Sequence, residues 1–168
     1  MKLSFVALLR GINLGAKNKV DMKSLKALFE EMNYENVRTY IQTGNVIFDN
    51  ATYNVSQLEG ALQETYGFDI PVIIRSKEEL EEIQQHPIFS KEQVYVMFLA
   101  KEVLDDQLAM LNSLVDDEFV VWNRRNIIIS LSKNYHQTKF TNTFFEKKLS
   151  MPSTARNLNT VNKILLKM

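Results

Sequence analysis

A basic, glycine-containing segment follows the first apolar run of the chain and has the chemistry of an anion site. Residues 10–19 hold two glycines, which let backbone N–H groups turn toward a negative charge, and basic side chains at Arg10, Lys17 and Lys19. The spacing fits neither a Walker A motif nor the dinucleotide-binding glycine pattern. The alternative to an anion-binding role is a turn with solvated lysines. The candidate ligand-binding residues of this loop are Arg10, Gly11, Asn13, Gly15 and Lys17.

A second polar segment, residues 42–45 (QTGN), lies between two runs rich in β-forming residues. It offers side-chain amides, a hydroxyl and a flexible glycine, and an arginine stands on the run before it. The alternative is a plain hairpin turn, which the same residue types favour. The candidates here are Arg38, Gln42, Thr43 and Asn45.

The third segment, residues 154–160 (TARNLNT), comes just before the last apolar helical pattern. An arginine beside the free N–H groups of a helix start favours an anion. The alternative is that Asn157, Asn159 or Thr160 simply caps the helix. The candidates are Arg156, Asn157, Asn159 and Thr160. We predict that the three segments meet in one cleft formed by Arg10, Asn13, Asn45, Arg156 and Asn159.

Residues that usually carry catalysis or bind metal are scarce. The chain has no cysteine, and its two histidines, His86 and His136, lack metal-ligand spacing with each other or with nearby carboxylates. No G-x-S-x-G motif is present, so no nucleophile or general base stands out. We therefore expect no metal site and no cofactor, and we assign no catalytic residue.

Composition and charge set the broad class of protein. The 168 residues are 45% hydrophobic and 24% charged, which are ordinary values for globular proteins. Apolar runs such as residues 94–100 are far shorter than the roughly 20 residues of a membrane span, and the first residues do not resemble a secretory signal. We expect a soluble, cytoplasmic protein with no membrane partner. The sequence does not indicate the oligomeric state.

Charge is unevenly distributed along the chain although the formal net charge is zero. Residues 1–48 hold seven basic and four acidic residues, residues 49–118 hold four and fifteen, and residues 119–168 hold nine and one. Such asymmetry can create a surface field that attracts anions, unless folding interleaves the two signs.

The elements that must position these segments repeat one pattern. The first half predicts a strand over 3–9, a helix capped by Asp21, and strands over 37–41 and 46–48. A second helix is predicted to begin with a capping box at Ser56 and Glu59 and to end at Gly67, and a strand over 70–74 follows. This β-α-β-β-α-β order is that of a ferredoxin-like fold.

The second half repeats this topology with little sequence identity, as β-α-β-β-α plus an extra C-terminal helix, with the polar segment 154–160 at a loop position. A capping box at Ser76 and Glu79 opens an acidic helix. After it we predict a strand over 94–100, a helix around 104–111, and strands over 119–122 and 127–131. Two helices follow, over 140–149 and 161–168. We predict an α+β protein of two tandem ferredoxin-like subdomains, residues 1–75 and residues 76–168 with the extra C-terminal helix, packed as one compact unit.

Three motifs together resemble the bacterial domain-of-unknown-function family 1697: residues 8–15 (LLRGINLG), 37–46 (VRTYIQTGNV) and 154–161 (TARNLNTV). The resemblance runs over essentially the whole chain. It departs from the family pattern at Ala16, where a second glycine is usual, at Thr43, where serine is usual, and at Leu158, where tryptophan is common. The resemblance implies a duplicated ferredoxin-like fold and no established activity, substrate or cofactor.

Three functions fit these residues. The first is a binding module for a phosphate-bearing ligand, which is a nucleotide, a phosphorylated metabolite or RNA. The second is an enzyme acting on a small anionic substrate, oriented by Arg10, Arg38 and Arg156, with Asn45 or Asn159 donating to developing charge. The third is a protein-interaction or oligomerisation module in which the polar segments serve only as turns and caps. Fold analogy does not choose among them.

Overall fold

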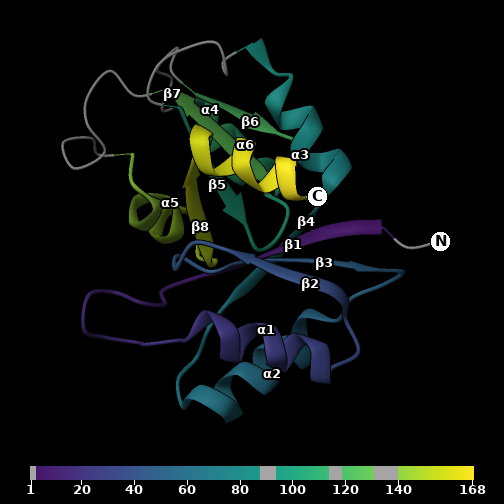
Figure 1. The fold of residues 1–168 in the computed structure, drawn as a ribbon. Coiled ribbons are helices and arrows are strands. Elements are labelled where there is room, and N and C mark those ends of the chain that lie inside the picture. Colours follow the sequence, from purple (N-terminus) through teal and green to yellow (C-terminus); the bar gives the residue numbers. More distant parts are fainter. Residues whose placement is uncertain (1–2, 88–93, 114–118, 131–139) are drawn as a thin grey trace. The chain divides into compact units, whose positions relative to one another are not determined.

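The computed structural model describes residues 3–87, 94–113, 119–130 and 140–168 (Figure 1). The chain divides into two units, Met1–Leu80 with Lys163–Met168, and Glu81–Asn162. Among the described residues, no helix combines the length and the apolar content needed to cross a membrane.

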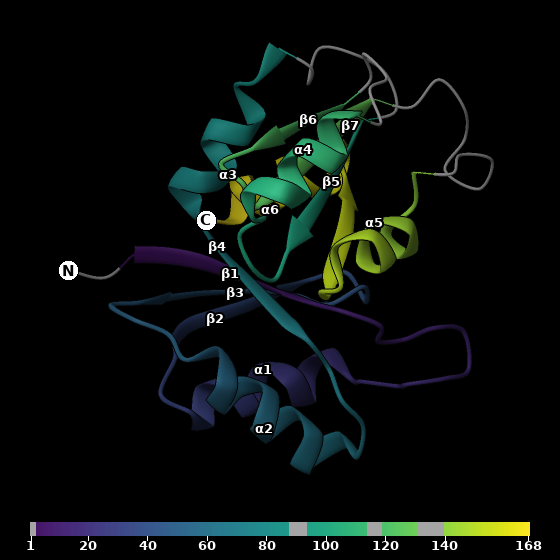
Figure 2. The same ribbon diagram turned by 180° about the vertical axis from the view of Figure 1, so that it is seen from behind.

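The first unit contains one antiparallel sheet with two helices on one face. Its elements are β1 (Leu3–Leu9), α1 (Met22–Glu31), β2 (Glu35–Tyr40), β3 (Asn45–Asn50), α2 (Val55–Tyr66) and β4 (Val72–Ser76). The strand order is β2-β3-β1-β4, so the first strand lies in the middle of the sheet. Both helices lie on the same side of the sheet when it is seen from the front and from behind (Figures 1 and 2).

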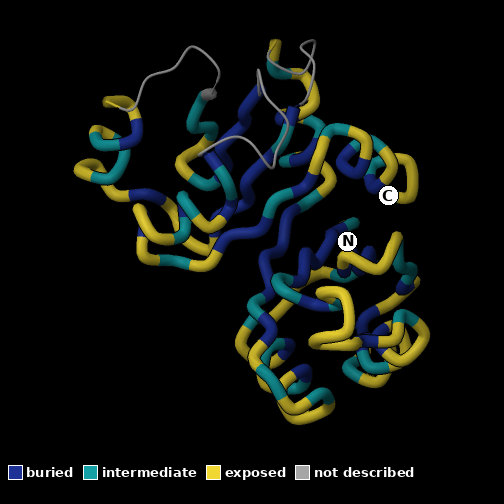
Figure 3. Tube along the Cα trace, turned by 90° about the vertical axis from the view of Figure 1, so that its left-hand side faces the viewer, coloured by how far each residue is buried: buried dark blue, intermediate teal, exposed yellow. Residues whose placement is uncertain are grey.

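Strand alternation explains this arrangement. Phe5, Ala7 and Leu9 of β1 point to one face, where they pack with Leu25 and Phe29 of α1 in a buried apolar cluster. The cluster also contains Leu58 and Leu62 of α2, Val46 and Phe48 of β3, and Val72 and Ile74 of β4. Figure 3 shows the result, with buried residues along the strands and exposed residues on the outer turns of the helices.

The second unit repeats the topology. Its elements are β5 (Val94–Leu99), α4 (Asp105–Ser113), β6 (Phe119–Trp122), β7 (Asn126–Ser130), α5 (Asn142–Leu149) and β8 (Ser153–Asn157), with strand order β6-β7-β5-β8. Met97 and Leu99 pack with Leu111 of α4 and with Phe145 and Leu149 of α5. The division between the units falls within α3 (Lys77–Gln84) and within α6 (Leu158–Lys167). Two tandem ferredoxin-like subdomains with a C-terminal helix, as predicted, are therefore confirmed.

Several predicted helix ends are confirmed. Asp21 caps α1 by accepting from Ser24 N at 3.0 Å, and Gly67 ends α2 in the left-handed conformation. The capping box at α3 is also present, because Glu79 N donates to Ser76 Oγ at 3.2 Å and Ser76 N donates to Glu79 Oε1 at 3.3 Å.

Three local predictions are wrong. The cap of α2 is Asn54, which accepts from Gln57 N at 3.0 Å, and the Glu59 carboxylate instead accepts from Val72 N at 2.9 Å. The first N–H of the edge strand β4 needs an acceptor, and the Glu59 carboxylate accepts from it rather than from the start of α2. The polar residues at 153–157, predicted as a loop, form β8; backbone pairing with β5 overrides a sequence that lacks the apolar pattern of a strand. The fourth strand of the first half also lies two residues later than predicted.

The two units share details as well as topology. Val6 pairs with Arg75 in the first sheet, and Val96 pairs with Arg156 in the second. Both units also use a glutamate to satisfy the first N–H of the fourth strand, since Glu146 Oε2 accepts from Ser153 N at 3.0 Å as Glu59 does from Val72 N. Matching positions in the two units can therefore be compared directly.

Candidate functional site

The connection between β1 and α1 is the longest loop of the first unit and is held in a defined shape. Gly11 and Gly15 have φ of 78° and 59°, a region that glycine enters without steric cost. Leu14 and Lys17 form an isolated antiparallel bridge across the tip. Leu14 and Lys17 exchange two backbone hydrogen bonds, and the Asn18 side chain donates from Nδ2 to Gly11 O at 3.0 Å. The predicted loop is therefore a small hairpin closed by its own backbone.

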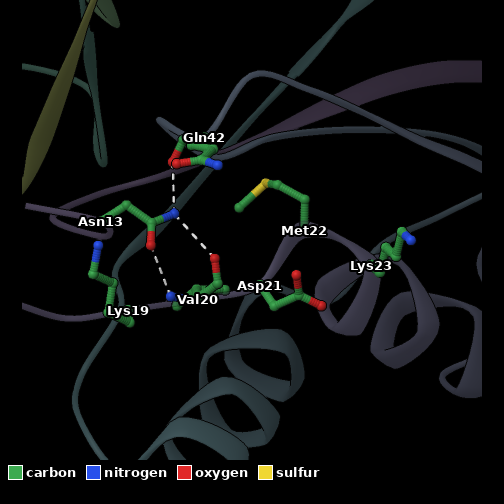
Figure 4. Close-up of a pocket in the computed structure, with 7 residues that line it drawn as sticks. All are labelled: Asn13, Lys19, Val20, Asp21, Met22, Lys23 and Gln42. Atoms are coloured by element: carbon green, nitrogen blue, oxygen red, sulfur yellow. Dashed lines mark hydrogen bonds between the residues drawn. The ribbon is translucent and has the colours of Figure 1, made fainter.

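Asn13 fastens this loop to the β2–β3 hairpin. Its Oδ1 accepts from Val20 N at 2.8 Å, while its Nδ2 donates to Val20 O at 3.0 Å and to Gln42 O at 2.8 Å (Figure 4). Both amide hydrogens donate to backbone carbonyls, so the Asn13 side chain links the β1–α1 loop to the β2–β3 hairpin. Its φ of 51° is one that asparagine tolerates better than most residues.

An open pocket of about 420 Å³ lies where the loop meets α1. Its lining consists of Asn13, Lys19, Val20, Asp21, Met22, Lys23 and Gln42. Figure 4 shows Lys19 and Lys23 on opposite sides of the opening, with the Met22 side chain between them. The Asp21 carboxylate is turned to the helix, where it accepts from Ser24 N. Two ammonium groups therefore flank a partly apolar depression.

Sequence reasoning found part of this lining. The sequence predicts Asn13 and Gln42 as ligand-binding residues and includes Lys19 in the basic loop, but it does not single out Lys23. The signal for Lys23 is its position two residues after the cap Asp21, which places it in the first turn of α1 beside the loop. Arg10 and Lys17 do not line this pocket: Arg10 is half-buried with its N donating to Pro71 O at 3.0 Å, and Lys17 is exposed.

The hairpin at residues 41–44 packs tightly under the loop. Gly44 has a φ of 95°, and a Cβ there would lie 2.8 Å from Ile12 Cδ1 and 2.9 Å from Leu9 Cβ. The wholly buried Asn45 donates from Nδ2 to Tyr40 O at 2.9 Å and to Thr43 Oγ1 at 3.1 Å. These contacts fit the predicted alternative of a hairpin turn, and they fix where Gln42 presents its carbonyl to Asn13.

Arg38 is engaged by groups of its own unit. Its Nη1 lies 3.1 Å from Asp49 Oδ1, and its Nε donates to Lys167 O at the end of α6 at 2.8 Å. Burial raises the pKa of Asp49, but hydrogen bonds from Asn36, Arg38 and Ser4 and the guanidinium charge outweigh it and hold that pKa below its ordinary value of 3.8. Arg38 therefore caps a helix end and pairs with a carboxylate.

A second depression, of about 490 Å³, lies beside this pair. Its lining is Leu3, Ser4, Glu35, Asn36, Asp49, Lys77 and Met168. With Arg38 beside Asp49, its two carboxylates face two basic groups, whereas the loop pocket has two lysines and one carboxylate. The loop pocket is therefore the more positively charged of the two.

The third predicted segment belongs to the second unit. Arg156 is buried in β8, with Nη1 donating to Thr154 Oγ1 at 2.6 Å and to Ala155 O at 2.9 Å. Asn157 Oδ1 accepts from Thr160 N at 2.9 Å, which is the capping role left open by the sequence, and Asn159 is exposed. Arg10, Asn13 and Asn45 lie in the first unit and Arg156 and Asn159 in the second, so their convergence in one cleft stays a prediction.

Sequence reasoning missed Arg75, the counterpart of Arg156. Arg75 is 1% exposed, its Nη1 donates to Ile74 O at 3.0 Å, and its Nε lies 3.8 Å from Glu79 Oε2. The available signal was the repeated order of an arginine, a small polar cap and a helix, at 75–77 and at 156–158.

Within the described ranges no cluster of His, Asp and Glu side chains has the arrangement of a metal site. His86 contacts the Trp122 ring edge-on, with centroids 5.3 Å apart. His136 lies outside the described residues.

Comparison with known proteins places the chain in a family. No curated protein matches it. A solved structure, the conserved bacterial protein SP0830 from Streptococcus pneumoniae, is similar in fold, with a TM-score of 0.71 and 23% identity over 99% of each chain. The family model described as Protein of unknown function (DUF1697) matches residues 3–127, which include the motifs at 8–15 and 37–46 but not the one at 154–161. Because that match covers most of the chain, this protein belongs to the DUF1697 family.

Proposed function

We propose that this protein is a binding module for a small phosphate-bearing ligand, held in the pocket between the β1–α1 loop and the start of α1. The observation that carries the proposal is a difference between two otherwise matching units. The first unit connects β1 to α1 through residues 10–21, whereas the second connects β5 to α4 through residues 100–104. The fold itself therefore does not require the long loop, and long ordered loops commonly carry function.

The charge and rigidity of the loop support an anionic ligand. Lys19 and Lys23 line the pocket, and the charge of the nearby carboxylate of Asp21 is directed to the helix amide that it caps. Asn13 donates two hydrogen bonds and accepts one, and these three bonds hold the loop in place before any ligand arrives. A preorganised site loses less conformational entropy on binding, which favours affinity for a small ligand.

Thermal-shift screening followed by calorimetry tests the proposal. The panel contains inorganic pyrophosphate, nucleotides, phosphorylated sugars and short RNA, each at about 50 and 200 mM salt. We expect at least one small phosphate compound to raise Tm. Lys19→Ala and Lys23→Ala should each weaken its binding about tenfold, which corresponds to about 1.4 kcal/mol.

Lys26→Ala is the matched control. Lys26 is an exposed lysine on the same helix that does not line the pocket, so its loss should leave affinity within about twofold while changing net charge equally. No response to any phosphate compound, or a hit that ignores Lys19 and Lys23, contradicts the proposal. Turnover of the bound compound would instead identify an enzyme. A Tm shift with RNA alone, and a steep salt slope, would instead identify a nucleic-acid binder.

Arg156, in the second unit, stays a predicted anion-binding residue. Weaker binding of the same ligand to Arg156→Ala supports that role, and unchanged binding contradicts it.

A further inference from the structure

The Gln42 side chain lines the loop pocket, but the contact that Gln42 makes with the loop does not use it. That contact runs through the Gln42 backbone carbonyl, which accepts from Asn13 Nδ2 at 2.8 Å. Among the residues that the structure describes, the side-chain amide of Gln42 makes no hydrogen bond. Because many residue types could supply the carbonyl, the loop contact does not explain an amide at this position.

The turn that carries Gln42 is one residue longer than its counterpart in the second unit. The β2–β3 turn spans residues 41–44, and the β6–β7 turn spans residues 123–125. In each unit the last residue of the turn accepts from the end of the middle strand, from Leu9 N at 2.9 Å and from Leu99 N at 2.8 Å. The extra residue therefore lies in the earlier part of the turn, which contains Gln42.

The Gln42 amide adds a chemistry that the charged groups of the pocket lack. Lys19 and Lys23 only donate hydrogen bonds, and the Asp21 carboxylate only accepts them. The amide hydrogens of Asn13 already donate to backbone carbonyls. The Gln42 amide both donates and accepts, and Figure 4 shows it on the hairpin side of the pocket, across from Asp21.

A hydroxyl group is the natural partner of such an amide. A hydroxyl both donates and accepts, so it can pair with a primary amide in either direction, whereas an ionised phosphate uses only donors. The pocket volume of about 420 Å³ lies within the range of about 300–1,000 Å³ that is usual for pockets holding organic ligands. The pocket therefore has room for an organic group attached to the phosphate.

We infer that Gln42 is a specificity residue that hydrogen-bonds a hydroxyl group of the ligand, and that the ligand is a phosphate ester of a sugar or another polyol. The inference rests on the proposed function and narrows its ligand class. The two lysines attract the phosphate group, and Gln42 distinguishes a hydroxylated ester from an alkyl ester.

Glycerol 3-phosphate and propyl phosphate test this role, because they share a carbon skeleton and differ in their hydroxyl groups. Calorimetry should show that the wild-type protein binds glycerol 3-phosphate about fivefold more tightly than propyl phosphate. Gln42→Met keeps the side-chain length without its polar atoms, and it should bring this ratio to about one. The variant keeps the carbonyl that accepts from Asn13, so its Tm should stay within about 2 °C of the wild-type value.

Gln63→Met is the matched control, since Gln63 is an exposed glutamine on α2 that does not line the pocket. It should leave the preference for glycerol 3-phosphate unchanged. A wild-type protein that binds inorganic pyrophosphate without preferring glycerol 3-phosphate overturns the inference and leaves the proposed function standing. The inference also fails if Gln42→Met keeps the preference, or if it lowers Tm by more than about 4 °C, which would give the side chain a structural role. A wild-type protein that binds neither pyrophosphate nor either ester overturns the proposed function and the inference together.

Discussion

Replacing Asn13 by alanine tests the side-chain hydrogen bonds that link the β1–α1 loop to the β2–β3 hairpin beside the pocket. The change removes one acceptor and two donor interactions, of which the two with Val20 are partly buried and the one with Gln42 is exposed. Each such bond contributes about 0.5–1.5 kcal/mol net, and water can replace the exposed one. Alanine also tolerates the φ of 51° less well than asparagine.

We therefore expect Asn13→Ala to lower the free energy of unfolding by about 2–3 kcal/mol. Because about 1 kcal/mol shifts Tm by 2–4 °C in a chain of this size, Tm should fall by about 4–12 °C. Urea denaturation followed by circular dichroism measures the first quantity. Hydrogen exchange at the Val20 amide, which loses its acceptor, reports on the loop directly.

Two further substitutions at Asn13 divide this loss into its parts. Asn13→Gly removes the side-chain bonds but accepts the backbone conformation. Asn13→Asp keeps the acceptor for Val20 N and loses both donors, so its loss should be intermediate. Asn18→Ala is the matched control, with a φ of 54° and one exposed bond, and should cost about 1 kcal/mol. The structural role of Asn13 is refuted if Asn13→Ala lowers the free energy of unfolding no more than Asn18→Ala does and leaves hydrogen exchange at the Val20 amide unchanged.

Two other predictions concern the same unit. In Gly44→Ala the residue would keep a strained φ, and its new Cβ would have contacts under 3.0 Å. We expect the free energy of unfolding, measured by urea denaturation, to fall by about 2–4 kcal/mol. A fall below about 0.5 kcal/mol would contradict the close approach of Gly44 to Leu9 and Ile12. Asp49→Asn should lower the free energy of unfolding by about 0.5–1 kcal/mol at neutral pH. Because the folded-state pKa of Asp49 is depressed, its contribution is present above 3.8 and is lost as pH falls through the folded-state pKa. The wild-type and variant stabilities should therefore converge in acid, and a gap that is independent of pH would refute the ion pair with Arg38.

Much of the fold follows from local patterns that the sequence shows directly. The apolar alternation of β1 and the 3.6-residue spacing of α1 reveal which faces are buried. Asp21, Ser76 and Gly67 mark helix ends through interactions that span only a few residues. Such features are predictable because the interacting groups are close in sequence.

The features that the sequence does not predict differ from these local ones, because each depends on contacts between residues far apart in the chain. Glu59 accepts from a strand that begins thirteen residues later, so the capping box that its spacing suggests does not form. The residues of β8 are polar, and only their pairing with β5 makes them a strand. The contacts of Arg38 with Asp49 and with the end of α6 also join distant segments, and its predicted ligand-binding role stays a prediction.

A duplicated α+β protein, the helix ends at Asp21, Gly67 and Ser76, and a loop rich in glycine, asparagine and basic residues all follow from the sequence, because these depend on near neighbours and on composition. Tertiary structure alone decided that Asn13 fastens the loop to the β2–β3 hairpin, that Lys23 joins Lys19 at the pocket, and that the second unit makes the same connection without the loop. These depend on hydrogen bonds and packing between distant segments, whose geometry no local pattern encodes.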